Sequence, residues 1–526
     1  MPVNRIPFRF PAYGRGFLGE QNREGETDEI FQAGALVRCR NFEIIGRGRL
    51  LKRKGDLRYD STAITSAATQ GLAMWNFDRT RKLLGVCGGR VKWLSAASTW
   101  SDITGSFAPT AGQNNQVRFT QFQRGSSQFL IGTGANKTAL WKWPGSGNIQ
   151  AITDTSYPGY AVDVCECFGR LWMINTPNGA VLTEYTLDGD ETQIDDYVIA
   201  SAQSPGMGLT KHNDGTLLVF HEDSIHAIRL NFDSASPPFQ RAVVDGSTGA
   251  HSTQSIITYQ GATYFVGPDG IYRIKDPAYP AQYISYPIEE WWNGINQARV
   301  PYIVAVGRGE PWTSIAFLVS TGTNTGHNAV VAYNPRLDAW AIWESNSASA
   351  LAFNCGIDFI DSNGRHLTLC GDYGGFVRSC WGHEENDTGN VDDGSNLQVA
   401  ITTELKTGFM EMGYDGLKRI RQMWLDLEIE DDKMFTINLT GIAANPATSR
   451  TQVIGAEGDR LSQTFIFGAS RFASKNPTQA KILRSAKARL FQFSLAESDD
   501  GKPYQLNAVR FLYVPRGRRI QAYGAS

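Results

Sequence analysis

The chain has 526 residues, of which 50 are Lys or Arg and 52 are Asp or Glu, giving a formal net charge of −2. This balance excludes a uniformly basic nucleic-acid-binding protein and an acidic disordered chain. Aromatic residues make up 11% of the chain, charged residues only 19%, and 54 residues are Gly, a composition that favours short strands joined by tight turns.

The first 60 residues predict an extended N-terminal arm followed by entry strands. Residues 1–35 are rich in Gly, Pro, Arg and Glu and show no periodicity, whereas residues 38–58 carry eight basic residues against Glu43 and Asp56. The N-terminus lacks the apolar stretch of a signal peptide, and the longest apolar runs, about five residues, are too short to span a bilayer. We therefore expect the chain to be made and folded in a cytoplasm.

Residues 61–385 predict a β-propeller. Apolar bursts of about four to seven residues, separated by Gly, Asn, Asp and Pro, indicate short strands. They group in fours, with a period of about 40–50 residues, which is typical of propeller blades. The groups lie at 69–107, 117–153, 165–198, 207–245, 253–284, 303–344 and 352–381, which predicts about six to seven blades. Turns at Gly88-Gly89, Asp269-Gly270 and Gly374-Gly375 join strands, and aromatic side chains are expected to fill the wedges between blades.

Two further regions follow. Residues 386–396 are acidic and rich in Gly, Asn and Ser, which predicts a solvated linker; a calcium loop is the alternative, although the spacing matches no EF-hand. Residues 397–526 have longer strands with cleaner alternation, as at 423–430, and predict a β-sandwich with a basic C-terminal tail. Short helices are expected at 478–490 and 287–296. The fold class is therefore all-β: a propeller followed by a C-terminal sandwich, with an extended N-terminal arm.

Catalytic and metal-binding motifs are missing from the sequence. The seven Cys residues form no Cys-x-x-Cys pair and are expected to be buried free thiols, and we expect no metal and no cofactor. No His-Glu-x-x-His, Gly-x-Ser-x-Gly or Walker A sequence occurs. Propeller sialidases carry repeated Asp-boxes, and the nearest match, at 498–501, has the wrong spacing. We therefore expect no enzyme and no catalytic residue.

Two basic clusters are candidates for contact with DNA in a channel or with a partner protein. They are Lys52, Arg53 and Lys54, and, in the C-terminal tail, Arg516, Arg518 and Arg519. Each could contact a phosphate, but no known nucleic-acid recognition module surrounds them, so partner docking or solvation is the more ordinary interpretation.

Several segments, in order, resemble the tail hub or nozzle proteins of short-tailed bacteriophages, also described as packaged-DNA stabilisation or tubular tail proteins. The resemblance begins at 36–55, with Asn41, Gly46, Arg53 and Gly55. It continues through most of the chain to residue 430, in segments that include Phe265-Val-Gly-Pro-Asp-Gly270 and Cys370-Gly-Asp-Tyr-Gly-Gly375; the others are 71–77, 100–105, 117–134, 141–143, 169–172, 288–295 and 401–405.

The resemblance implies a structural protein of the virion tail. Such a chain forms a homohexameric ring below the portal and adaptor and acts as a conduit that helps to retain packaged DNA and takes part in DNA ejection. Its partners would be other copies of itself, the portal and adaptor above, tail fibre, spike or needle proteins, and double-stranded DNA without sequence specificity. The alternative is a glycan-binding or glycan-hydrolysing propeller, which we would expect to be monomeric or dimeric.

Overall fold

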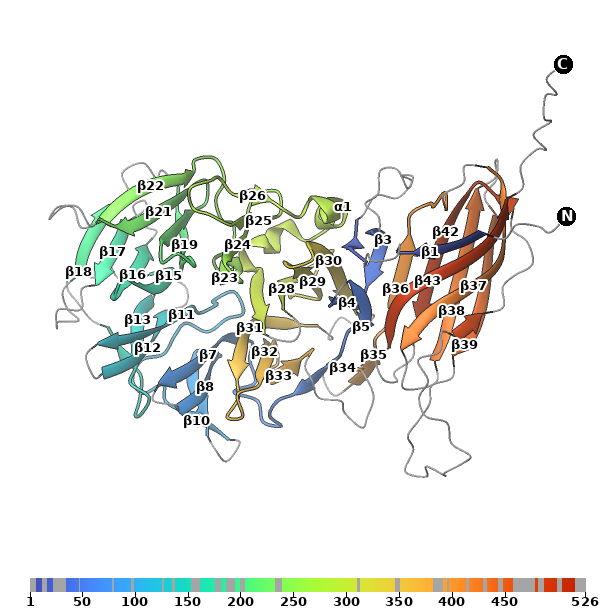
Figure 1. Ribbon diagram of the computed structural model, residues 1–526. Coiled ribbons are helices and arrows are strands. Elements are labelled where there is room, and N and C mark those ends of the chain that lie inside the picture. The colour runs from blue at the N-terminus through green and yellow to red at the C-terminus, as the bar shows by residue number, and fades with distance from the viewer. Residues whose placement is uncertain are drawn as a thin grey trace, which may run out of the picture. The chain divides into compact units, whose positions relative to one another are not determined.

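The structure is a computed structural model that describes most of the chain (Figure 1). The described residues are 6–11, 17–21, 35–46, 48–77, 80–95, 99–124, 127–134, 138–152, 161–175, 181–185, 194–198, 204–231, 239–309, 313–345, 351–381, 391–394, 397–412, 416–428, 433–442, 448–456, 478–480, 487–498 and 504–515. The chain divides into two compact units. We call Asp56–Val330 with Leu351–Gly382 the propeller unit, and Met1–Gly55 with Val331–Ala350 and His383–Ser526 the sandwich unit.

Five antiparallel sheets of the propeller unit have four described strands each, which lie side by side in chain order. Their strands are β7 (Thr69–Phe77), β8 (Thr80–Cys87), β9 (Arg90–Leu94) and β10 (Trp100–Asp102); β11 (Phe119–Arg124), β12 (Ser127–Gly134), β13 (Thr138–Trp143) and β14 (Gln150–Ala151); β15 (Asp163–Cys167), β16 (Arg170–Asn175), β17 (Val181–Tyr185) and β18 (Ile194–Val198); β19 (Gly206–Lys211), β20 (Leu217–His221), β21 (Ile225–Leu230) and β22 (Phe239–Asp245); β23 (Ile257–Tyr259), β24 (Ala262–Val266), β25 (Ile271–Ile274) and β26 (Gln282–Tyr283).

The remaining elements of this unit complete the ring. A sheet of β31 (Phe353–Ile360), β32 (His366–Asp372) and β33 (Val377–Cys380) is finished by β6 (Asp56–Arg58), which comes from the start of the unit. Strands β27 (Val304–Arg308) and β28 (Ser314–Val319) pair with each other, and β29 (Ala329–Asn334) carries the chain into the sandwich unit. The short helical elements are η1 (Thr253–Ser255), η2 (Tyr286–Ile288), α1 (Glu289–Trp292) and η3 (Gln297–Tyr302).

Seven inner strands form a closed circuit. Each first strand contacts the first strand of the next sheet, from β7 through β11, β15, β19, β23 and β27 to β31, and β31 contacts β7 again. Figure 1 shows this last junction, where the blue strand β7 lies beside the orange-yellow strand β31. The propeller therefore has seven inner strands, the upper end of the six to seven blades that the period predicts.

The first and last parts of the propeller unit are joined by strand β6. Arg58 faces Arg378 across the β6–β33 pairing, and Asp56 faces Cys380. The buried Arg378 donates Nη1 to Asp56 Oδ2 at 3.2 Å and Nε to Asp372 Oδ2 at 2.9 Å. Because Asp56 belongs to this blade, the propeller begins before residue 61, where the sequence places its boundary.

Tight turns and aromatic wedges occur where the sequence predicts them. Gly88 and Gly89 have φ of +57° and +74°, which lets a two-residue turn join β8 to β9. Between neighbouring sheets, aromatic pairs include Trp75 with Trp143, at 6.0 Å between ring centroids, and Phe220 with Phe265, at 5.1 Å. These pairs fill the interblade wedge with large apolar surface.

The sandwich unit contains two described sheets. One has the order β4 (Phe42–Ile45), β5 (Arg49–Lys52), β43 (Gln505–Pro515), β37 (Lys418–Glu428) and β40 (Thr478–Ala480), with β1 (Ile6–Phe10) on β43 and β41 (Lys487–Ala488) on β37. The other has the order β30 (Ala339–Glu344), β2 (Gly19–Glu20), β3 (Ala35–Arg40), β36 (Thr403–Thr407), β42 (Leu490–Glu497), β38 (Lys433–Ile442) and β39 (Thr448–Ala456). Strands β34 (Val391–Gly394) and β35 (Leu397–Ala400) pair with each other as an antiparallel hairpin.

Alternation along the strands makes the core of the sandwich unit. Met423, Leu425 and Leu427 are buried, as the period of two in this segment predicts. Aromatic rings join the two sheets, with Phe493 at 6.1 Å from Phe511 between centroids. The all-β prediction, with a propeller and a C-terminal sandwich, is therefore confirmed.

The N-terminal arm is extended, but its described parts are paired. Strand β1 lies antiparallel to β43, and β2 lies parallel to β3. Phe17 and Glu20 are fully buried, and Phe10 is 8% exposed. The absence of periodicity in residues 1–35 therefore does not mean that the segment is free, because single buried side chains hold it.

Three other expectations differ from the structure. The helix at 478–490 is wrong: residues 478–480 form β40 on β37, and Leu490 begins β42. Pairing with distant strands overrides the local helical preference there. Within the expected linker 386–396, residues 391–394 form strand β34, and the rest lie outside the described residues. Residues 331–350, expected in the propeller, belong to the sandwich unit. The other expected helix corresponds to α1.

Candidate functional site

Two of the predicted contact residues are internal to the sandwich unit. Lys52 is 0% exposed, and its Nζ lies 2.8 Å from Oε2 and 3.0 Å from Oε1 of Glu497. Arg53 is also 0% exposed and donates Nε to Asn41 Oδ1 at 2.9 Å. The expectation that these side chains contact DNA or a partner is therefore corrected, because both are enclosed by the fold.

The other four predicted contact residues are not shown to be buried in this way. Lys54 is half-buried, and its carbonyl oxygen accepts a hydrogen bond of 3.4 Å from Arg53 Nη1. Arg516, Arg518 and Arg519 lie outside the described residues. Part of the positive charge of residues 38–58 is therefore neutralised by ion pairs inside the fold and does not lie on the surface.

Asn41 lies in the segment 36–55, where the family resemblance begins, and its side chain hydrogen-bonds to distant parts of the chain. It has φ of +58°, a left-handed conformation that Asn tolerates better than most residues. Its Nδ2 donates to the carbonyl oxygens of Glu344, at 2.8 Å, and Thr402, at 2.7 Å. Its Oδ1 accepts from Arg53 Nε and from the Glu344 backbone N–H, each at 2.9 Å. One side chain therefore ties together four segments of the sandwich unit.

The buried acid Glu497 belongs to a second polar cluster. The Tyr504 and Thr403 hydroxyls lie 2.8 Å apart, and the Thr403 hydroxyl lies 3.4 Å from Glu497 Oε2. Burial, and then the charge of Glu497, raise the pKa of Tyr504 well above its ordinary value, so the phenol stays protonated. The cluster holds a neutralised ion pair in the interior and is structural in character.

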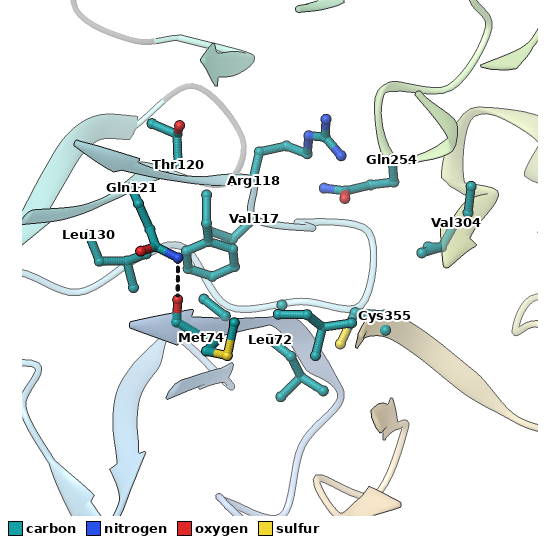
Figure 2. Close-up of a pocket in the computed structure, with 16 residues that line it drawn as sticks. Leu72, Met74, Val117, Arg118, Thr120, Gln121, Leu130, Gln254, Val304 and Cys355 are labelled. Carbon is teal, nitrogen blue, oxygen red and sulfur yellow. Dashed lines mark hydrogen bonds between the residues drawn. The ribbon is translucent and has the colours of Figure 1, made fainter. Parts of the chain in front are cut away.

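The cavity of most interest lies in the propeller unit, among the inner strands β7, β11, β27 and β31 (Figure 2). Its volume is about 380 Å³. Gly71 lets β7 approach β11 closely, since a Cβ there would lie 2.7 Å from the ring of Phe119. We call this space the central cavity. Its apolar lining includes Leu72, Val117, Leu130, Val304 and Ile357, and its polar lining includes Arg118, Thr120, Gln121 and Gln254.

Arg118 is oriented by a buried acid. Asp163 is 0% exposed, and its Oδ1 accepts from Arg118 Nε at 3.1 Å and from the Val164 backbone N–H at 2.8 Å. Its Oδ2 accepts from the Leu209 backbone N–H at 2.9 Å. Arg118 Nη2 makes one long contact, 3.4 Å, with the carbonyl oxygen of Ile256. The guanidinium is thus fixed through Nε and has further donors for the cavity.

The remaining polar groups of the central cavity differ in the hydrogen bonds that they make within the protein. Gln121 donates Nε2 to the Met74 carbonyl oxygen at 3.0 Å, the contact dashed in Figure 2. The Thr120 hydroxyl accepts from the Glu166 backbone N–H at 3.1 Å. Gln254 is half-buried, and no described residue hydrogen-bonds to its amide. Burial raises the pKa of the Cys355 thiol well above its ordinary value, so this lining group is uncharged.

None of these cavity residues was singled out from the sequence. The only available signal for Arg118 was a charged residue inside the apolar burst Val117–Phe122, from which the inner strand β11 begins at Phe119. Asp163 lies 45 residues further along the chain, so its pairing with Arg118 could not be read from spacing. Gln254 lies in a short 3₁₀ turn and carries no motif.

Other chemical groups are accounted for within the described residues. All seven Cys are free, as predicted; six are buried, whereas Cys165, also expected to be buried, is half-buried. No cluster of three or more His, Cys, Asp or Glu that could hold a metal ion occurs in the part of the chain that the structure describes. In the same part, no helix has the length and apolar character needed to cross a membrane.

Comparisons with known proteins add the following. No protein-family model and no curated protein matches the chain. Among solved structures, the chain is similar to a streptogramin B lyase, with a TM-score of 0.42 and 12% identity over 62% of this chain and 97% of that chain. It is similar to virginiamycin B lyase from Staphylococcus aureus, with a TM-score of 0.42 and 11% identity over 62% and 97% of the two chains. The WD40 β-propeller domain of Doa1 gives a TM-score of 0.37 and 10% identity over 62% and 95%. The likeness to these proteins concerns the fold alone.

Proposed function

We propose that the chain is a structural subunit of a bacteriophage tail, which forms a homohexameric nozzle ring below the portal and adaptor. Packaged DNA passes along the axis of the ring, and the ring helps to retain it. The sequence resemblance at 36–55 and in the later segments is the starting point of the proposal. The chain acts mechanically and not as an enzyme.

The observation that carries the proposal is the interlocking of the early and late strands of the sandwich unit. Strand β3 pairs with β36, β5 pairs with β43, and Asn41 bridges residues near 344 and 402. Residues about 300–450 positions apart in the chain therefore share the same sheets. A unit built in this way cannot be opened from one segment without breaking several strand pairings together, which suits a part that must withstand the pressure of packaged DNA.

Charge gives further support. Double-stranded DNA carries about one negative charge per 1.7 Å of its axis, so a strongly basic channel would bind it and oppose its sliding. The formal net charge of −2, with 50 basic and 52 acidic residues, suits a conduit. The burial of Lys52 and Arg53 removes two cations from any surface that faces DNA.

The alternative is a glycan-binding or glycan-hydrolysing propeller, which would use the central cavity. The cavity presents Arg, Gln and Thr side chains, which can hold hydroxyl and carbonyl groups. Its lining, as far as the structure describes it, includes no Asp or Glu, whereas most glycosidases use a pair of carboxyl groups. Of the two halves of the alternative, glycan binding therefore has the better support.

The deciding experiment measures the mass and symmetry of the purified full chain. Six copies of a 58.0 kDa chain give about 350 kDa, so native mass spectrometry and electron microscopy should find a sixfold ring, formed by the chain alone or after adaptor and portal are added. Stable nozzle contacts should bury roughly 2,000 Å² or more each. A monomer or dimer that stays so with those partners, and that binds glycans on an array, would replace the proposal with the alternative.

Two further measurements follow from the same proposal. No glycoside or ester substrate should show turnover that depends on a single carboxylate of the chain. Replacing Arg516, Arg518 and Arg519 together by Ser should leave folding and assembly intact. If these residues contact DNA, particles with the triple substitution should release genome at a lower temperature than wild type. An unchanged release temperature would show that these three arginines do not help to retain DNA.

A further inference from the structure

We propose that the central cavity of the propeller unit binds a small molecule with a carboxylate group, held by Arg118 and Gln254. This site is independent of ring assembly, so it stands or falls separately from the nozzle function. The ligand would be compact, with an apolar body and one acidic head.

The first argument is the preorganised guanidinium. Asp163 is fully buried and fixed by two backbone N–H groups, and it holds Arg118 through Nε alone. Among the described residues, no partner takes the hydrogens of Arg118 Nη1, and Nη2 makes only the 3.4 Å contact with Ile256. The Nη1–Nη2 edge therefore remains for a ligand, and the paired donors of this edge match the two oxygens of a carboxylate.

The second argument is the place of Gln254. Figure 2 shows Arg118 and Gln254 reaching into the same side of the cavity from different elements, with their head groups facing one another. The Gln254 amide is half-buried and has no hydrogen-bonding partner among the described residues. A carboxylate that accepts from the Arg118 edge could accept from Gln254 Nε2 as well. A polar amide that is open to a cavity can donate to a ligand that enters it.

The third argument concerns size and the rest of the wall. The volume of about 380 Å³ lies at the small end of the ~300–1,000 Å³ that small-molecule sites occupy. Leu72, Val117, Val304 and Ile357 offer apolar contacts to the body of a ligand. No acidic residue lines the cavity in the described structure, so the anion would meet no like charge at the wall. Asp163 is already bound to Arg118 and to backbone donors.

The test uses the full chain and benzoate as the probe, with benzyl alcohol as a neutral analogue of similar shape. Binding is followed by saturation-transfer NMR and titration calorimetry. We expect benzoate to bind at least about 10-fold more tightly than benzyl alcohol, because hydrogen bonds that involve charged groups are the stronger ones. Equal affinity for the two probes, or no binding of benzoate, would overturn the proposal; tighter binding of benzyl alcohol would point to a neutral hydroxyl ligand instead.

Two variants of Gln254 sharpen the test. Gln254→Glu keeps the size of the side chain but places a carboxylate opposite Arg118, where it competes with the ligand, so benzoate affinity should fall at least about 10-fold. Gln254→Ala removes one donor and should weaken benzoate only several-fold. Arg90→Gln is the control, since the Arg90 side chain is 56% exposed, lies on β9 and does not line the cavity. The thermal transition of each variant verifies folding. Unchanged benzoate affinity in a folded Gln254→Glu variant would refute the assignment.

Discussion

Breaking the buried Lys52–Glu497 ion pair should strongly destabilise the sandwich unit. Both side chains are 0% exposed, and Lys52 Nζ lies 2.8 and 3.0 Å from the two carboxylate oxygens. Removing one partner of such a pair leaves the other charge buried without compensation, which costs about 3–5 kcal/mol. For a unit of roughly 150–250 residues, 1 kcal/mol corresponds to about 2–4 °C, so Lys52→Met should lower its transition by roughly 6–20 °C.

The double variant separates the ion pair from simple packing. Glu497→Gln alone leaves the Lys52 charge buried and should cost about as much as Lys52→Met. Combining the two removes both charges and keeps an amide beside the Thr403 hydroxyl, so most of the lost stability should return. The coupling free energy between the two positions should therefore be several kcal/mol.

The assay must report on one unit at a time, because the chain has two units and a single unfolding free energy is not defined for it. Hydrogen exchange followed by mass spectrometry on peptides from β3, β36 and β42 gives the local opening free energy, and calorimetry gives the transition temperature. Lys54→Met, two positions further along the chain and half-buried, is the matched control and should shift the transition much less than Lys52→Met. Additive losses in the double variant, or a shift of less than about 2 °C in Lys52→Met, would refute the reasoning.

Three further outcomes are expected. Asn41→Ala should cost the sandwich unit about 2–4 kcal/mol, because four side-chain hydrogen bonds disappear and buried groups lose their partner. Burial raises the pKa of Glu20 from 4.5 to about 7, so its protonated form is favoured in the folded state, and local stability should be highest below about pH 4.5 and fall as the pH rises through 7; Glu20→Gln should remove this dependence. Lys82→Met should lower the propeller transition by a few degrees, whereas Lys82→Arg should not, since the ammonium lies 5.0–5.3 Å from the ring centroids of Trp75, Trp93 and Trp143.

A specific result would contradict each of these three predictions. If Asn41→Ala lowers the transition temperature of the propeller unit as much as that of the sandwich unit, the hydrogen bonds of Asn41 do not stabilise the sandwich unit specifically. The second prediction is compared through protection factors, which relate each measured exchange rate to the rate of an unprotected amide at the same pH. If the protection factors of the β2 and β3 amides are as high at pH 8 as at pH 5, ionisation of Glu20 does not oppose its burial. If Lys82→Met and Lys82→Arg are equally stable, the charge above the Trp rings contributes nothing measurable.

The sequence by itself determined the local elements of the chain. Bursts such as Phe129–Thr133, which lies in β12, became strands because β-branched and aromatic residues suit a pleated surface. Gly88-Gly89 became a turn because only glycine takes positive φ without cost. The period of about 40–50 residues predicted the propeller, since each thin sheet must bury its faces against neighbours of the same kind. The alternation at Met423, Leu425 and Leu427 predicted one buried face, because successive side chains point to opposite sides of a strand.

Only the tertiary structure decided which charged and polar residues are enclosed and what they meet. Lys52 and Arg53 look like a surface cluster in sequence, yet Lys52 finds its counter-ion 445 positions away. The segment at 478–480 has helical spacing, but pairing with β37 overrides it. Arg118 becomes a candidate ligand group only because Asp163, from the next sheet, fixes its Nε and leaves the opposite edge toward a cavity. Local preference depends on near neighbours in the chain, whereas burial and charge pairing depend on contacts that exist only after distant segments have come together.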